Sequence, residues 1–179
     1  MKINNRIAKF HRVSFEQFLE DYSKETHLDI HNVEAIKMVR NIWDNIKLPI
    51  RKTKGSAGYD INSTMSFKLE PNQTILIPTG IKCNMDEDWF LMVCPRSGLG
   101  FKYRMQLDNT LGIIDSDYFF SDNEGHIMLK ITNDSKSFNT LDIKEGDAIA
   151  QGIFLPYGIT VDDRADGIRN GGFGSTDRK

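Results

Sequence analysis

The chain has 179 residues, of which 39% are hydrophobic and 27% charged, which suits one compact domain with an appendage. Its formal net charge of −2 gives no electrostatic footprint for binding duplex nucleic acid. No apolar run reaches the roughly 18 residues of a transmembrane helix, and the N-terminus lacks the apolar run of a signal peptide, so a cytoplasmic protein without membrane contact is expected.

Residues 1–46 are expected to form a mostly helical N-terminal extension. Ser14, followed three residues later by Gln17, matches a capping box and predicts a helix that begins there. Apolar residues recur at helical spacing between Val33 and Trp43, which predicts a second helix with one apolar face. The simplest interpretation is that this face packs on the main domain, and nothing specific indicates a protein partner.

From Lys47 onward, short β-rich runs alternate with Gly, Pro, Asn and Asp. The clearest runs read TILIPTGIKC, WFLMVCP, HIMLKITN and AIAQGIFLP. Pro78 interrupts the first run, as expected near a sheet edge or corner. Regularly spaced short strands predict an all-β sandwich or barrel over residues 47–166, followed by a Gly-rich arm over 167–179 that cannot hold a fold by itself.

Cysteine and histidine usage adds little chemistry. Cys83 and Cys94 lie in apolar, strand-like runs; they could pair, but buried reduced thiols are favoured. The four histidines show no metal-ligand spacing with each other or with the cysteines, so no zinc site is expected.

Five short stretches stand out from the β scaffold. They read GSAGYDI (55–61), PRSGLG (95–100), NTLGIIDSDY (109–118), GDAIAQGIF (146–154) and GGFGST (171–176). Each is weak alone, since an Arg-Ser-Gly is often an ordinary turn and paired aspartates are usually solvated. As chemistry, Arg96 can hold a phosphate bidentately, and the Asp115 carboxylate can take a proton from an attacking water. Phe173, alone among glycines, suits a lid that stacks on a flat base.

Together, the order and spacing of the five stretches resemble those of the trimeric dUTP diphosphatases (dUTPases), over roughly Lys47 to Thr176. The resemblance implies a β jelly roll, a homotrimer with active sites shared between subunits, and a C-terminal arm that closes over a site. It also implies hydrolysis of dUTP to dUMP and pyrophosphate by water attack on the α-phosphorus. That reaction keeps uracil out of DNA and supplies dUMP for dTMP synthesis.

The third stretch matches the part of the family site that reads the nucleoside. Asp115 matches the catalytic aspartate, which orients and deprotonates the attacking water. Tyr118 matches the residue under the deoxyribose, where a ring leaves no room for a 2′-hydroxyl. Asn109 matches the uracil-reading asparagine, since an amide offers both a donor and an acceptor. The nucleoside-binding set that the resemblance implies is Asn109, Gly112, Ile113, Ile114 and Tyr118.

The other stretches match the groups that hold the phosphates and the metal. The phosphate set consists of Arg96, Ser97, Gly98 and Gln151, joined by Arg169, Gly174, Ser175 and Thr176 of the arm, while Phe173 stacks on uracil. Asp60 matches an aspartate that contacts waters on a Mg²⁺ ion. The triphosphate itself holds that ion, so no direct protein ligand is expected.

The sequence departs from the family pattern in four places, and three alternatives stay open. Asp177 stands where a glycine often follows GFGST, and the helical N-terminus lies beyond the common minimal domain. The hairpin over 119–125 is lengthened, and Arg169 stands one residue nearer Phe173 than in many members. A non-catalytic dUTP-binding regulator could use the same fold, with the extension contacting a partner. A dCTP deaminase would need an acid/base glutamate where this chain has Asp115. A β-sandwich without activity is the third alternative.

Overall fold

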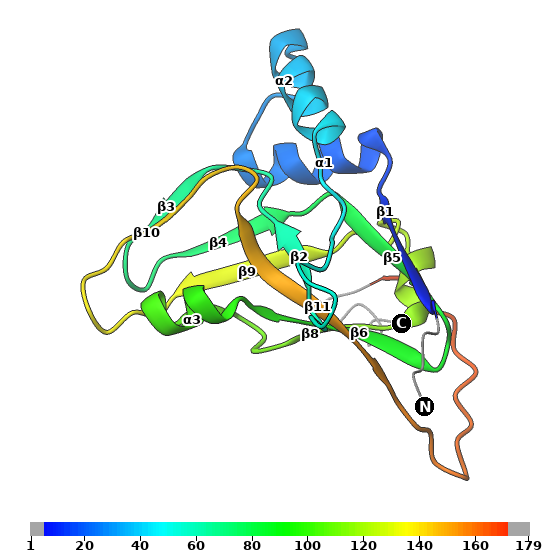
Figure 1. Ribbon diagram of the computed structural model, residues 1–179. Helices are drawn as coiled ribbons and strands as arrows, with labels where there is room; N and C mark the ends of the chain where they lie inside the picture. The colour runs from blue at the N-terminus through cyan, green and yellow to red at the C-terminus, as the bar shows by residue number, and fades with distance from the viewer. Residues whose placement is uncertain (1–5, 172–179) are drawn as a thin grey trace.

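The computed structural model describes residues 6–171, which form a mainly β domain with two helices on one side of it (Figure 1). One sheet has four antiparallel strands in the order β2-β11-β6-β8, and another has three in the order β4-β9-β7. Their bounds are β2 Tyr59–Asn62, β4 Thr74–Pro78, β6 Trp89–Pro95, β7 Met105–Leu107, β8 Gly112–Ile114, β9 Met128–Asn133 and β11 Ala148–Pro156. This confirms the expected jelly-roll type of fold, although the sheets are not closed into a barrel.

Two short ladders complete the β domain. Their strands are β1 Ala8–Arg12 with β5 Ile81–Met85, and β3 Phe67–Leu69 with β10 Leu141–Ile143. All four β-rich runs singled out in the sequence form strands, and Pro78 ends β4 as expected. The core between the sheets is mainly aliphatic, with Ile77, Leu91 and Ile131 fully buried. Each such side chain contributes about 1.5–3 kcal/mol by leaving water.

The N-terminal extension contains both expected helices, α1 Phe15–Thr26 and α2 Val33–Asp44. They pack on the β domain through a second buried cluster in which Phe18 and Val39 are fully enclosed. Val33, at the start of the predicted apolar face, is 61% exposed. The extension also supplies β1, which the sequence analysis did not anticipate.

The predicted capping box at α1 is only half formed. Ser14 caps the helix, since its hydroxyl accepts a hydrogen bond from the Gln17 backbone N–H at 3.1 Å. The Gln17 side chain does not return to Ser14 but donates to Asp21 at 2.9 Å. The Ser14 N–H donates to Glu124 Oε2 instead, at 2.9 Å. A residue 110 positions away therefore completes the cap and ties the helix to the β domain.

Three smaller features qualify the sequence analysis. The PRSGLG stretch opens a short helix, α3 Ser97–Tyr103, rather than a simple turn. Cys83 and Cys94 are free thiols, and burial raises the pKa of Cys83 to about 12, which makes it a poor nucleophile. None of the helices within residues 6–171 is long and apolar enough to span a bilayer.

Candidate active site

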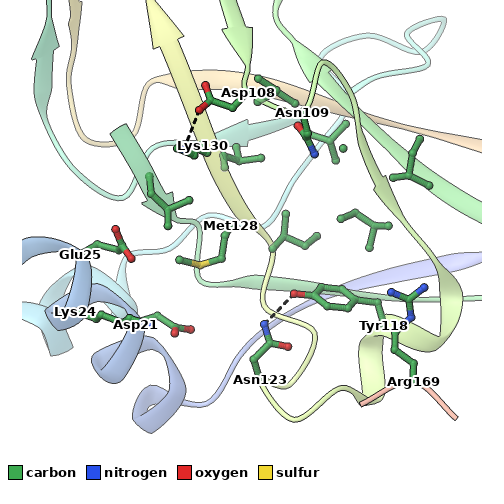
Figure 2. A pocket seen from close by; sticks show the side chains of 18 residues that line it. Asp21, Lys24, Glu25, Asp108, Asn109, Tyr118, Asn123, Met128, Lys130 and Arg169 are labelled. Atoms are coloured by element: carbon green, nitrogen blue, oxygen red, sulfur yellow. Dashed lines mark hydrogen bonds and ion pairs between the residues drawn. The ribbon is translucent and has the colours of Figure 1, made fainter. Parts of the chain in front are cut away.

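A cavity of about 510 Å³ lies between the β domain and α1. Figure 2 shows Asn109 at one end of it, and Tyr118 and Arg169 at the other. Six residues expected to contact substrate line it: Asn109, Gly112, Ile113, Ile114, Tyr118 and Arg169. The structure therefore brings together the whole nucleoside-binding set implied by the sequence.

The turn between β7 and β8 positions Asn109. The Thr110 N–H donates to the Leu107 carbonyl at 2.8 Å, and Thr110 takes a left-handed φ of 68°. Gly112 then pairs with Val93 of β6, where a Cβ would approach the Val93 Cβ to 3.2 Å. A glycine at this position lets β8 lie close against β6, which fixes the Asn109 end of the cavity.

Asp115 and Tyr118 are held on one tight turn. The 3₁₀ helix η1 Ser116–Phe120 begins directly after Asp115, whose carbonyl accepts from the Tyr118 N–H at 3.2 Å. Tyr118 is only 6% exposed. Its hydroxyl donates to the His126 carbonyl at 2.9 Å and accepts from Asn123 Nδ2 at 2.8 Å. Burial raises the pKa of Tyr118 above its usual value, so the hydroxyl stays a neutral donor.

Arg169 reaches this turn from the segment that follows β11, which leaves the β domain and returns to it (Figure 1). Its Nε donates to Asp117 at 2.8 Å, and its guanidinium also forms an ion pair with Asp115. Asp115 therefore has a cation beside it in the chain without substrate. The expectation that Arg169 holds the γ-phosphate stays a prediction.

A second cluster gathers on neighbouring strands of the four-stranded sheet. Gln151 of β11 lies opposite Asp60 of β2. Arg96, at the end of β6, places Nε 3.3 Å from Asp60 Oδ1. Gly58 leaves room for the Gln151 side chain, since a Cβ would come within 2.3 Å of Gln151 Oε1 and the amide would have to shift. Ser97 lies beside this cluster at the exposed start of α3.

The Asp60 carboxylate suits water-mediated contact with a cation. Its side chain is 10% exposed, and the buried Oδ2 has no hydrogen-bond partner among the described residues, with Lys52 Nζ at 3.8 Å. A buried carboxylate oxygen without a donor is a natural acceptor for a metal-bound water. Between residues 6 and 171, no three His, Cys, Asp or Glu side chains gather closely enough to hold a metal directly.

The two groups of residues lie apart in the single chain. Arg96, Gln151 and Asp60 are absent from the described lining of the cavity. Ser97 and Gly98, which are also expected to bind phosphate, follow Arg96 at the start of α3 and are likewise absent from the described lining of the cavity. Phe173, Gly174, Ser175 and Thr176 lie outside the described residues, so the expectations on them remain predictions.

Several cavity residues escaped the sequence analysis. Asp21, Lys24 and Glu25 of α1 form one side of the cavity (Figure 2). The segment over 119–125, predicted as a lengthened hairpin, is not a hairpin: it contains the end of η1 and the turn after it, because β8 and β9 on either side belong to different sheets and do not pair. Asn123 of this segment lines the cavity beside Tyr118. No local signal marks these residues, because they reach the cavity only through the docking of α1 and the path of the 119–125 segment.

Comparisons with known proteins agree with this geometry. The dUTPase family model matches residues 44–177. A deoxyuridine 5′-triphosphate nucleotidohydrolase of Lactococcus lactis is 35% identical over 152 residues, which are 83% of this chain and 99% of the relative. The crystal structure of a Streptococcus mutans dUTPase superposes with a TM-score of 0.56 at 32% identity, covering 63% of this chain and 88% of that one.

A Staphylococcus bacteriophage 80alpha dUTPase structure extends the likeness along the chain. It covers 96% of this chain and 98% of its own at a TM-score of 0.61. At 20% identity, this match shows the fold alone. The sequence relatives and the family model carry the assignment, and on their strength the chain belongs to the dUTPase family.

Proposed function

We propose that the chain hydrolyses dUTP to dUMP and pyrophosphate. Its relatives from Lactococcus lactis and Legionella pneumophila are named deoxyuridine 5′-triphosphate nucleotidohydrolases. One observation supports this most: Asn109 and Tyr118 line one cavity, and Asp115 lies on the same turn as Tyr118. In this proposal, one folded unit carries the residue that recognises uracil, the residue that lies under the deoxyribose and the carboxylate that acts as general base.

The nucleoside half of the reaction follows from the cavity. The Asn109 amide pairs with the uracil edge, together with backbone groups of the strand that begins at Gly112. The Tyr118 ring lies under the deoxyribose and leaves no space for a 2′-hydroxyl, so UTP is excluded by a clash. Tyr118 suits this task because both hydrogen bonds of its hydroxyl are made within the chain.

Asp115 acts as the general base. It takes a proton from a water whose oxygen forms a new bond to the α-phosphorus. The bond from that phosphorus to the bridging oxygen breaks, and pyrophosphate leaves with the electron pair. Arg169 must move off Asp115 for this step, and the negative phosphates of an incoming nucleotide supply a competing partner for its guanidinium.

The phosphate half uses Arg96, Ser97, Gly98 and Gln151. The Arg96 fork binds phosphate oxygens, and Asp60 would accept hydrogen bonds from waters on a Mg²⁺ ion. That ion, when bound, spreads the charge of the phosphates. Because this cluster is separate from the cavity in one chain, we propose that a homotrimer joins the cavity of one subunit to the phosphate cluster of another. The arm, with Phe173, then closes over the joined site.

The direct test measures pyrophosphate release from dUTP, dCTP, dTTP and UTP, with Mg²⁺ and with a chelator. We expect release from dUTP alone, and its loss with the chelator. Binding of dUTP without release would contradict the enzyme proposal and favour a nucleotide-binding regulator. Ammonia release from dCTP would instead indicate deaminase chemistry.

A further inference from the structure

We infer that the N-terminal extension and the segment over 119–125 serve sugar selection, with Asn123, His126 and Asp21 as positioning residues for Tyr118. The inference rests on the proposed role of Tyr118 as the floor under the deoxyribose. It assigns a task to the two parts of the chain that the family motifs leave unexplained.

The first residue that positions Tyr118 is Asn123 of the 119–125 segment. Its Nδ2 donates to that hydroxyl at 2.8 Å, as drawn in Figure 2. Its Oδ1 accepts from the Gly125 N–H at 3.2 Å, so the amide is held at both ends. A phenol that donates to one fixed carbonyl and accepts from one fixed amide cannot rotate its ring freely.

The 119–125 segment folds back tightly on the turn that carries Tyr118, which fixes the position of Asn123. Gly125 has a φ of +71°, and a Cβ there would come within 2.5 Å of the Tyr118 carbonyl oxygen and 2.7 Å of the Phe119 Cα. The end of the 119–125 segment therefore rests directly on the backbone of the turn that carries Tyr118. Asn123 and Gly125 return to Tyr118, whereas Phe120 is 76% exposed.

The second residue that positions Tyr118 is His126, whose carbonyl receives the Tyr118 hydroxyl and whose ring is fully buried. Its Nε2 accepts the Gly80 N–H at 2.8 Å. A backbone N–H can only donate, so Nε2 carries no proton and the Nδ1 proton faces Asp21 Oδ2 at 2.6 Å. Both ring nitrogens are thus occupied, and the backbone of His126 is fixed by its own side chain.

The third, Asp21, joins these residues to α1. Asp21, which holds the His126 ring, is oriented by Gln17 of the same helix. Glu124, beside Asn123, accepts the Ser14 N–H at the start of α1 and pairs with Lys82 at 3.0 Å. The start of α1 therefore contacts Glu124, and Asp21 of the helix contacts His126, so that the residues on both sides of Gly125 are held. The helix also forms a wall of the cavity through Asp21.

The decisive experiment is a double-mutant cycle read as the ratio of kcat/KM for UTP to that for dUTP. Tyr118→Phe removes the hydroxyl but keeps the ring, and Asn123→Ala removes its donor. We expect each single variant to raise the ratio about 3- to 10-fold, the scale of one lost hydrogen bond. We expect Asn123→Ala to add nothing in the Tyr118→Phe background, because the amide acts through the hydroxyl.

The extension is tested with Asp21. Asp21→Ala removes the acceptor for His126 and should raise the ratio, whereas Asp21→Asn keeps a carbonyl acceptor and should restore most of the discrimination. Glu20→Ala is the matched control, since Glu20 is an exposed acid of the same helix and should leave the ratio unchanged. Melting temperatures measured alongside identify any variant that is poorly folded.

The outcomes separate this inference from the proposed function. A wild-type protein that does not cleave dUTP contradicts the function itself. Selective cleavage of dUTP with unchanged ratios in all variants overturns the positioning role alone. Additive effects of Tyr118→Phe and Asn123→Ala would also overturn it, because they would mean that Asn123 acts through the fold of the 119–125 segment and not through the Tyr118 hydroxyl.

Discussion

The nucleoside cavity and the phosphate cluster are built by the same chain in opposite ways. The cavity is walled by β8, β9, η1 and α1, and Tyr118 within it is 6% exposed with both hydroxyl bonds made. In the cluster, the Arg96 side chain is 43% exposed, and Ser97 and Gly98 lie open at the start of α3. The residues proposed to select base and sugar are therefore held in a pre-organised cavity, whereas those proposed to bind phosphate lie on an open surface.

The contrast has a physical reason. Base and sugar are told apart by shape and by one or two hydrogen bonds, which need rigid walls. A triphosphate is bound by charge and by many donors, and an open cluster lets it enter before other groups close around it. Subunit assembly and an arm can complete the second task, and the arm would add to the first the stacking proposed for Phe173.

The largest expected effect concerns Asp115, which directly precedes the turn that carries Tyr118. Asp115→Asn should lower kcat about 10²- to 10⁴-fold, because an amide cannot accept the proton of the attacking water. Binding of a non-hydrolysable dUTP analogue, followed by calorimetry, should change little. Asp117→Asn is the matched control, since Asp117 lies two residues from Asp115 and also contacts Arg169 but has no proposed role with water. Near-normal turnover in Asp115→Asn would mean that another group is the base.

Removal of residues 172–179 tests the completion of the phosphate side. Both buried clusters lie between Phe10 and Ala150, so the melting temperature should stay within about 2–4 °C of that of the full chain. Turnover of dUTP should fall about 100-fold, because the phosphates lose groups that position them. A large loss of melting temperature with unaltered turnover would assign the arm a structural role instead.

Mixed oligomers test whether the two regions meet across subunits. Asp115→Asn and Arg96→Ala should each be inactive alone. Mixed by unfolding and refolding at equal amounts, they should recover about a quarter of the wild-type activity if each site takes Asp115 and Arg96 from different chains. No recovery would mean that one chain supplies both residues. Mixing each variant with itself gives the baseline.

The sequence carried the local signals well and the long-range ones poorly. Ser14 marked the start of α1, and alternating apolar runs marked the main strands. β1 was missed because only Phe10 of its five residues is buried, and its pairing with β5 depends on distant residues. The motifs located Asn109 and Tyr118, which line the cavity, and Asp115, which is not in the lining but directly precedes the turn that carries Tyr118. They could not indicate that α1 walls the cavity or that Glu124 completes the helix cap, since both arise from tertiary docking.

The smallest expected effect concerns two contacts that join α1 to the segment around Gly125, and we call them the clamp. They are Asp21 with His126, and the Ser14 N–H with Glu124. Burial disfavours the charged forms of Asp21 and Glu124, but hydrogen bonds outweigh it: those from His126 and Gln17 lower the pKa of Asp21, and those from Ser14 and Lys82 lower that of Glu124. A carboxyl whose pKa is lower in the folded state stabilises the fold above its ordinary pKa, and this stabilisation is lost as the pH falls through the folded value. The melting temperature should therefore decrease as the pH drops from about 5 toward 3. In the Asp21→Asn, Glu124→Gln double variant this decrease should be shallower, whereas Glu16→Gln, an exposed change on the same helix, should leave it as in the wild type. An identical slope in the double variant would mean that the clamp contributes nothing to stability through its charges, and that the rigidity of the cavity comes from the buried Phe18 cluster alone.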